Sequence, residues 1–553
     1  MKDSLSKLSL ALSLVFFACN RDGYMSLNQT YQRSSKKTTI QTSAVSDYQT
    51  YTISSVAGGK FIEVDGNITF NEKFQDSRLL VQYGPTQSDN LWQKWQVIYR
   101  STVSNIKYYH IMNLHSGKLL SVPVGFTTTG LQLEQYLNYG SDAQLWRIQE
   151  IGKTGTCNII NKETGLAITN KSGSTTDGTP IVQEEPGPAD SQKWKMNPVA
   201  ADTYRDDAVV RFFNRNNTSQ GSVAFDQGNT VPLTWSTNNG KVLWITQDAW
   251  DGTNIQSSGL FNCGGFHNYS NSVILQPSTT IWDSNAPNMT IPNSTSGKLR
   301  QVFNVQSTGG WSWAGPGVEI GAHVYVHVEE GTNGNDNPTS QSLYDLTQNT
   351  GTQWSSVRTS PAGMSGQVTI RYSRGMVKAS DNYVYVFGSQ SIRFGYGVNV
   401  YVARFPISNP QSWTFWNGSG WASTPSTAAS AKIAEALGTV HVSYVNGKYV
   451  LMTMDNGFNC DDPRNVYLAT STSPTGGFTP RKQVYKIQEF LKGQFARYYT
   501  PIIHPEFNNG RNELLLTYSL NFSACGVDPC TNGYKDPYYY RVKAIRVPYS
   551  LIP

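Results

Sequence analysis

Asp226 and Asp248 are the residues of this sequence whose types and spacing best suit acid–base chemistry. They flank two apolar segments, 230–235 and 241–246, which are separated by Asn239-Gly240. An Asn-Gly step between apolar segments predicts a β-hairpin, because both turn residues tolerate positive φ. In a hairpin, the start of the first strand and the end of the second lie at the same edge, so the two carboxylates should meet. Such a pair can hydrolyse a glycosidic bond, one carboxyl as acid and the other as base or nucleophile.

The same hairpin pattern recurs four more times, which separates it from an isolated turn that happens to carry aspartates. Each repeat joins two apolar segments through Gly, Asn-Gly or Asp-Asn turn residues. The repeats occupy residues 317–327, 376–387, 440–451 and 502–516, and third strands are expected at 398–404, 466–470 and 540–545. Five units of roughly 60–80 residues, each able to form a four-stranded meander, predict a five-bladed β-propeller over residues 203–553. A pair of β-sandwiches explains the equal spacing less well.

Propeller geometry places the starts of the innermost strands at one mouth of the central channel. We expect Asp226 and Asp248 there as catalytic carboxylates, with Glu435 as a third candidate acid. One carboxyl needs a raised pKa to protonate a leaving oxygen, and a second carboxylate nearby helps to raise it. Arg374 is expected to bind sugar hydroxyls or to tune such an acid. The other predicted substrate-binding residues are Trp250, Trp313 and Tyr499, as platforms for sugar rings, and Asp455.

The propeller segments also resemble a known family. Val231-Pro232-Leu233, Leu243-Trp244, Asp248 and Gly252 are similar to the opening of a bacterial propeller family of unknown function, and residues 413–421, 472–478 and 499–505 extend the similarity. Some members of that family are regarded as endo-D-arabinanases, and five-bladed furanosidases share the architecture. The resemblance implies a glycoside hydrolase acting on a furanose-containing, arabinan-like polysaccharide. A non-catalytic cell-surface lectin is the alternative, and a structural scaffold of a surface complex is a third hypothesis.

Residues 46–198 contain a different repeat, of roughly fifty residues. Each copy opens on a glycine followed by an apolar strand and closes on Gln-x-Trp. The closings are Gln93-Lys94-Trp95, Gln144-Leu145-Trp146 and Gln192-Lys193-Trp194. Three closings in register resemble the ricin-type β-trefoil lectins, in which these tryptophans build a shared core. The chain is therefore expected to be all-β, with a β-trefoil joined to the propeller.

The trefoil resemblance also implies where sugar would bind. In that family an acid in the first strand hydrogen-bonds hydroxyls, and an aromatic side chain about ten residues before the Gln-x-Trp tryptophan stacks on the ring. The candidates are Glu63, Asp65, Tyr83 and Asn90 in the first repeat, and Tyr136 and Asn138 in the second. Ser121 stands where the second repeat would carry its acid. We expect the first repeat to bind, the second to bind weakly if at all, and the third to be structural.

The N-terminus is typical of an export signal. Lys2 and Lys7 precede the apolar segment 8–18, which is too short to span a bilayer. Because this segment ends at Cys19, residues 1–19 resemble a bacterial lipobox in which Cys19 becomes lipidated; an ordinary cleaved signal is the alternative. Residues 20–45 are polar and are interpreted as a flexible linker. The protein is expected outside the cytoplasm, as an outer-membrane or cell-surface lipoprotein or a secreted protein, touching a membrane only through a lipid anchor.

The composition narrows the classes of partner and cofactor. The net charge of +6 is spread over 553 residues without a basic stripe, which argues against nucleic acid and leaves polysaccharide as the expected partner. No cofactor is required. A structural cation held in the channel by His441 or His504 is one interpretation, although a lone mid-strand histidine is more often simply packed.

The cysteine spacings do not match a zinc site. Cys525 is close enough to Cys530 in sequence for a small-loop disulfide, and Cys263 could pair with Cys460, which would leave Cys157 free. The connectivity itself cannot be read from the sequence.

Overall fold

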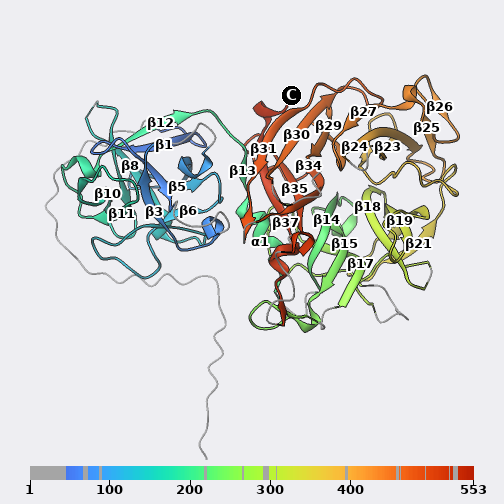
Figure 1. The fold of residues 1–553 in the computed structure, drawn as a ribbon, viewed down its shortest axis with the longest axis horizontal. Helices are drawn as coiled ribbons and strands as arrows, with labels where there is room; N and C mark the ends of the chain where they lie inside the picture. Colours follow the sequence, from blue (N-terminus) through green and yellow to red (C-terminus); the bar gives the residue numbers. More distant parts are fainter. Residues whose placement is uncertain are drawn as a thin grey trace, which may run out of the picture. The chain divides into compact units, whose positions relative to one another are not determined.

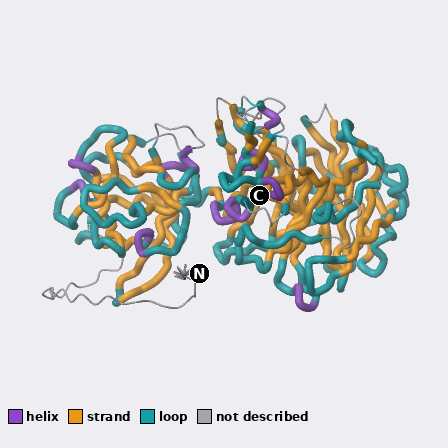
Figure 2. Tube along the Cα trace, turned by 90° about the horizontal axis from the view of Figure 1, so that it is seen from below, coloured by secondary structure: helices purple, strands orange, loops and turns teal. Residues whose placement is uncertain are grey.

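The computed structural model describes residues 45–553 except for 66–71, 86–89, 153, 217–220, 264–266, 291–297, 307, 393–395, 456–459, 461, 492–493, 522 and 527–532. The described residues are almost entirely strands and loops, with one α-helix, α1 (Asp207–Phe212) (Figures 1 and 2). No helix in these ranges is long and apolar enough to cross a membrane. The predicted signal segment, Cys19 and nearly all of the predicted linker lie outside the described residues.

Twelve strands of the N-terminal part form one closed set of antiparallel pairings. They are β1 (Thr50–Ser55), β2 (Phe61–Val64), β3 (Arg78–Tyr83), β4 (Lys94–Val103), β5 (Ile106–Asn113), β6 (Leu119–Ser121), β7 (Glu134–Tyr136), β8 (Trp146–Glu150), β9 (Cys157–Asn161), β10 (Ala167–Asn170), β11 (Thr179–Glu184) and β12 (Trp194–Val199). Four strands per repeat, three times over, make the β-trefoil that the sequence predicts.

The Gln-x-Trp tryptophans form the centre of the trefoil. Trp95, Trp146 and Trp194 are fully buried in one core cluster. Each indole Nε1 donates to a backbone carbonyl in the second strand of its own repeat: Ile62 at 3.0 Å, Leu120 at 2.9 Å and Ile168 at 2.9 Å. Because a buried indole needs an acceptor, this repeated bond explains why tryptophan occurs at the same place three times.

The remaining strands form the five blades of a propeller. Blade 1 is β14 (Ser222–Pro232), β15 (Val242–Asp251) and β17 (His267–Gln276); blade 2 is β18 (Gly310–Ile320), β19 (His323–Thr332), β20 (Ser340–Thr347) and β21 (Ser355–Thr359). Blade 3 is β22 (Met376–Lys378), β23 (Tyr383–Ile392), β24 (Gly397–Pro406), β25 (Thr414–Trp416) and β26 (Trp421–Ala422), with β27 (Ala434–Ala436) paired to β24. Blade 4 is β28 (Val440–Val445), β29 (Lys448–Met454), β30 (Arg464–Ser471) and β31 (Lys482–Ile487). Contacts between successive innermost strands, β14, β18, β22, β28 and β34, run around the ring and close it.

Blade 5 is built from both ends of the propeller sequence. It consists of β34 (Arg497–His504), β35 (Glu513–Asn521) and β37 (Val542–Pro548), and its outermost strand is β13 (Tyr204–Arg205). Tyr204 pairs with Arg546, and Arg205 with Ile545. The first residues of the propeller therefore complete its last blade.

Loops at the mouth join neighbouring blades covalently and by short strands. β16 (Phe261–Asn262) in the blade 1 loop pairs with β36 (Tyr534–Lys535) in the blade 5 loop, and β32 (Phe490–Leu491) pairs with β33 (Gln494–Phe495) before blade 5. Cys460, in the loop after β29, is bonded to Cys525, in the loop after β35. The loops of blades 4 and 5 are thus tied together at the mouth.

The structure forms a disulfide that differs from both candidate pairs, and Cys157 is free and buried. Cys525 bonds Cys460 rather than Cys530, and Cys460 therefore cannot bond Cys263, which is itself in a disulfide. The reason is that consecutive blades bring the loops after their second strands side by side, at a Cα–Cα distance of 5.7 Å. Neighbours around the ring pair, rather than neighbours in sequence.

Candidate functional site at the propeller mouth

The structure brings Asp226 and Asp248 together at the mouth, as the hairpin pattern predicts. Asp226 on β14 pairs with Gln247, the residue before Asp248 on β15. The regular register of β14 is broken on both sides of Asp226, and Gln227 and Asp248 have positive φ angles of 54° and 42°. Irregular strands and left-handed residues re-aim side chains at active sites, at a cost in stability. The turn of the hairpin is longer than Asn239-Gly240, because 236–238 form a 3₁₀ turn.

Asp226 lies in a nearly closed environment between blades 1 and 5. Asp226 is 8 % exposed, and its carboxyl accepts hydrogen bonds from the hydroxyls of Tyr499 and Tyr540. Burial raises the pKa of Asp226 to about 7, and the charge of Asp248 adds to the increase. The strand is irregular at Tyr499 as it is at Asp226. Thr500, the next residue, has a φ of 49°, and the register of β34 shifts there.

Asp248 is held from the opposite side, by blade 2. Trp313 Nε1 on β18 donates to Asp248 Oδ1 at 2.8 Å. Burial raises the pKa of Asp248 to about 6, the Trp313 bond opposes this, and the charge of Asp336 adds to it. Burial thus raises the pKa of both carboxyls, and the charge of Asp248 also favours the protonated form of Asp226.

A cavity of about 330 Å³ opens beside Asp248 between blades 1 and 2. Its lining includes Trp311, Trp313, Tyr269 and Asp336. The rings of Trp311 and Trp313 are stacked, with centroids 3.9 Å apart. The mouth thus combines a carboxyl pair with an adjoining aromatic and polar pocket.

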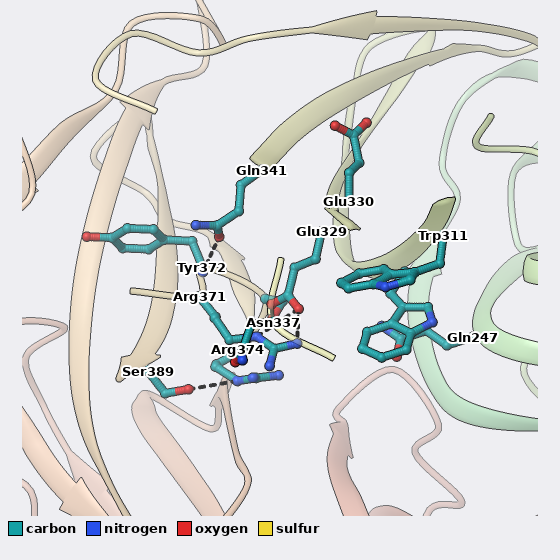
Figure 3. Close-up of polar contacts among 12 residues, drawn as sticks. Gln247, Trp311, Glu329, Glu330, Asn337, Gln341, Arg371, Tyr372, Arg374 and Ser389 are labelled. Carbon is teal, nitrogen blue, oxygen red and sulfur yellow. Dashed lines mark hydrogen bonds and ion pairs between the residues drawn. The ribbon is translucent and has the colours of Figure 1, made fainter. Parts of the chain in front are cut away.

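Arg374 lies at the mouth on blade 3, in a cluster of charged side chains (Figure 3). Its Nε donates to Ser389 Oγ at 2.8 Å. The neighbouring Glu329 is already bound by Arg371, whose Nε donates at 2.8 Å, and by the Ser373 hydroxyl. Burial lowers the pKa of Arg374 to about 10, with Glu329 opposing the decrease, whereas the Arg371 and Arg374 charges hold the pKa of Glu329 at about 2 despite burial. Arg374 is therefore a desolvated cation that interacts with Glu329, a carboxylate already bound by Arg371.

The first trefoil repeat also gathers the residues expected to bind sugar. Glu63 accepts from Gln93 Nε2 at 2.8 Å, is hydrogen-bonded to Asn90 and lies 3.6 Å from Lys73 Nζ. Glu63 is buried, and burial raises its pKa. Asn90 Oδ1 accepts from the backbone N–H of Trp92 at 2.9 Å. The polar side chains of this repeat are therefore fixed by one another.

The outer part of that repeat and the second repeat are more open. Asp65 and Tyr83 are half-buried beside the Glu63 group. In the second repeat Tyr136 is half-buried against Tyr139, with ring centroids 5.5 Å apart, and the exposed Asn138 accepts from the backbone N–H of Gly140 at 3.2 Å.

The trefoil and the propeller each match a known protein family. Residues 206–545 match a family described as a domain of unknown function, DUF5005. The chain belongs to the DUF5005 family. Residues 91–184 match the ricin-type β-trefoil lectin domain-like family, which indicates carbohydrate binding. No curated protein matches the chain.

Several solved structures are similar to parts of the chain. A designed three-fold symmetric protein, ThreeFoil, is 26 % identical with a TM-score of 0.24, over 27 % of this chain and 99 % of its own. An exo-β-1,3-galactanase from Clostridium thermocellum is 26 % identical with a TM-score of 0.25, over 28 % and 31 %. A Bacteroides ovatus protein provisionally named a hydrolase is 17 % identical with a TM-score of 0.48, over 62 % and 90 %.

Three side chains assigned to the mouth from the sequence have other surroundings in this DUF5005 propeller. Trp250 is buried against Tyr540, with ring centroids 4.8 Å apart, and Lys535 Nζ lies 4.6 Å from its ring. It packs the wall and is not an open platform. Asp455 accepts from the backbone N–H and the Nδ2 of Asn465 at 2.9 and 2.7 Å, within its own blade.

Glu435 lies on β27, at the side of blade 3. Its side chain is 61 % exposed and forms an ion pair with Lys432. It is therefore not buried as the two aspartates are.

The histidines expected near the channel are packed among protein groups. Both ring nitrogens of His504 are within 2.7 Å of a hydroxyl, Nδ1 of Thr230 and Nε2 of Thr517. His441 Nδ1 accepts from the backbone N–H of Ile503 at 3.3 Å, and burial lowers the pKa of His441 to about 3. Within the described residues, no three His, Cys, Asp or Glu side chains are grouped to hold a metal ion. Both rings are therefore hydrogen-bonded to protein groups.

Tyr540, Trp311 and Asp336 were missed by the sequence reasoning. Tyr540 ends a 3₁₀ turn (Pro537–Tyr540) that enters the mouth just before β37, and no local pattern marks it. Trp311 is two residues before Trp313, so the pairing of the two rings was a usable indication. Asp336 lies in the loop between β19 and β20, and only the fold shows that this loop reaches Asp248.

Proposed function

We propose that this protein is a glycoside hydrolase acting outside the cytoplasm on a furanose-containing, arabinan-like polysaccharide. The observation that carries the proposal is the buried carboxyl pair, Asp226 and Asp248, at the mouth of the channel. The furanose class follows from the sequence resemblance to the family that includes endo-D-arabinanases. The Cys460–Cys525 disulfide supports an oxidising compartment, and the trefoil supports an appended glycan-binding role.

The environments of the two carboxyls give them different roles. Among the described residues, Asp226 accepts hydrogen bonds from hydroxyls only, and burial with the charge of Asp248 raises its pKa to about 7, so it keeps its proton and acts as the general acid. Asp248 ionises first, and the Trp313 indole stabilises its charge, so it acts as base or nucleophile. Tyr499 and Tyr540 orient Asp226 from blade 5. Arg374 supplies a cation for sugar hydroxyls on the facing side.

The decisive experiment replaces each carboxyl without changing its size. Asp226→Asn or Asp248→Asn should lower hydrolysis of a furanose polysaccharide by roughly 10²–10⁴-fold, because acid–base catalysis contributes this much. Reducing ends released from arabinan by the purified protein provide the measurement, and circular dichroism shows that the variants stay folded.

Asp381→Asn is the control. Asp381 lies in the turn before β23 on the far face, where it accepts from Tyr385 Oη at 2.6 Å, and its variant should keep the parent rate. Wild-type turnover in both mouth variants would place the catalytic site elsewhere. If the parent cleaves no polysaccharide, the protein is a non-catalytic glycan-binding lectin instead.

A further inference from the structure

The cavity beside Asp248 adjoins the carboxyl pair and is large enough to hold part of a ligand. Blade 5 contacts Asp226 through Tyr499 and Tyr540, whereas the cavity lies on the other side of the pair, between blades 1 and 2. Its volume of about 330 Å³ is near the lower end of ligand pockets, which span roughly 300–1,000 Å³. It therefore fits a unit of one or two sugar residues, directly next to the bond that the pair would cleave.

One wall of the cavity is a rigid aromatic pair. Trp311 is buried and its Nε1 donates to the carbonyls of Thr332 and Asn335, both at 3.0 Å. Trp313 stacks on it, stays half-buried, and uses its own Nε1 to hold Asp248. A large aromatic surface that is already immobilised binds an apolar sugar face at little entropic cost.

The cavity also has a charged part. Asp336, an exposed carboxylate, belongs to its lining. Among the described residues, Asp336 forms no hydrogen bond or ion pair, and its charge acts on Asp248 and Arg371. An ionised carboxylate accepts hydrogen bonds only, so it suits sugar hydroxyls. Two carboxyls, Asp248 and Asp336, and one ammonium, that of Lys298, line the cavity, so its charge is negative when all three are ionised and disfavours a carboxylate on a sugar. Asn268 and Asn333 add neutral amides to the same lining.

We propose that this cavity is a subsite for one or two neutral sugar residues, in which Asp336 accepts hydroxyl hydrogen bonds and Trp313 is the platform. The inference rests on the proposed function, because it gives that site a preferred substrate class: neutral glycan over glycan that contains uronic acids. It also makes Asp336 a residue of both specificity and catalysis, since its charge reaches Asp248.

Asp336→Asn tests the subsite in the active protein. Hydrogen bonds to a charged group are strong enough that their loss should raise KM for neutral arabinan roughly tenfold to a hundredfold. Removing the charge should also move the acidic limb of the kcat/KM profile to lower pH, because Asp336 raises the pKa of Asp248. A merely structural residue would not shift that limb.

Asp345→Asn, on β20 of the same blade, is the matched control. Asp345 pairs with His323 at the other end of the blade, and its variant should leave KM and the pH profile unchanged. An Asp336→Asn protein with the parent KM and pH profile would overturn the subsite while leaving the proposed function intact.

Binding to the inactive Asp226→Asn variant separates the two proposals. Calorimetry with a linear arabinofuranose tetrasaccharide should show binding that weakens at least tenfold when Asp336→Asn is added. A galacturonate tetrasaccharide should bind at least tenfold more weakly than the neutral one. If the parent hydrolyses nothing but neutral binding depends on Asp336, the subsite stands and the hydrolase proposal fails. Preference for galacturonate, or no binding of either probe, would overturn the subsite.

Discussion

At the scale of single residues, Asp226 shows a conflict between stability and chemistry. Its pKa in the folded protein is about 7, above the usual value for aspartic acid. Below about pH 4 the carboxyl is protonated in both the folded and the unfolded state. Between about pH 4 and 7 the unfolded chain releases the proton first, so unfolding becomes more favourable as the pH rises. The group that the site needs therefore destabilises the fold at neutral pH.

Asp226→Asn should accordingly stabilise the protein, and only at higher pH. Asparagine does not titrate, so the variant should match the parent near pH 4 and exceed it above pH 7 by on the order of 2–4 kcal/mol. Urea titrations at pH 4, 5.5 and 7.5 measure the difference, with Asp381→Asn as the control. If the difference in unfolding free energy between variant and parent stays constant with pH, burial does not raise the pKa of Asp226.

The sequence predicted the residues of the site better than their surroundings. Asp226, Asp248 and Tyr499 were identifiable because hairpin ends and early strand positions meet at a propeller mouth. Trp250 was assigned to an open platform because position alone does not show which residue covers a ring, and here Tyr540 comes from 290 positions later in the chain. Glu435 was misplaced because a short strand, β27, turns it to solvent. Such contacts depend on neighbouring blades.

At the scale of elements, the innermost strands approach each other backbone to backbone. The Val442 N–H donates to the Arg374 carbonyl at 2.7 Å, which joins blades 3 and 4 beside a mouth residue. Gly375, with a φ of 138°, makes this approach possible. A Cβ at Gly375 would lie 2.0 Å from the carbonyl oxygen of Val442.

Gly375→Ala should therefore separate two blades and displace Arg374. We expect a loss on the order of 3 kcal/mol or more, from a strained φ together with a backbone clash. Gly510→Ala is the matched control, because Gly510 also has a positive φ of 74° but has no atom within 4 Å of an added Cβ. It should cost only roughly 1–2 kcal/mol. Equal losses in thermal unfolding would contradict the close approach.

Strand positions were largely predictable from turn residues and alternation, whereas the irregularities were not. The breaks in register around Asp226, Asp248 and Thr500 lie where strands of blades 1 and 5 reach the mouth. Nothing in the residues themselves encodes these breaks, since Gln227 and Thr500 are ordinary strand residues.

At the scale of the whole molecule, the trefoil has a core of its own. Trp146 lies in a cluster made only of trefoil residues. Trp146→Ala should cost on the order of 3–5 kcal/mol, because it leaves a large cavity and an unpaired Leu120 carbonyl. Phe126→Ala, at an exposed trefoil position, should change stability by less than about 0.5 kcal/mol. Calorimetry of the full chain measures the stability of both variants. A Trp146→Ala protein as stable as the parent would contradict the shared core.

The architecture followed from the two repeat periods, because a unit that recurs with its turns intact must fold the same way each time. The way the ring closes did not follow from them, since β13 contains only two residues and carries no strand pattern.

That closure sets the order of events during synthesis. Tyr204 and Arg205 leave the ribosome more than three hundred residues before their partners in β37. Until Val542 and the rest of β37 have emerged, one edge of β35 is unpaired. The strand before α1, β13, also has no partner until then. The propeller therefore closes only after β37 has been synthesised, in one slow long-range step. A chain stopped anywhere before Val542 keeps an open ring with an exposed edge, which is the kind of surface that other unfinished chains pair with.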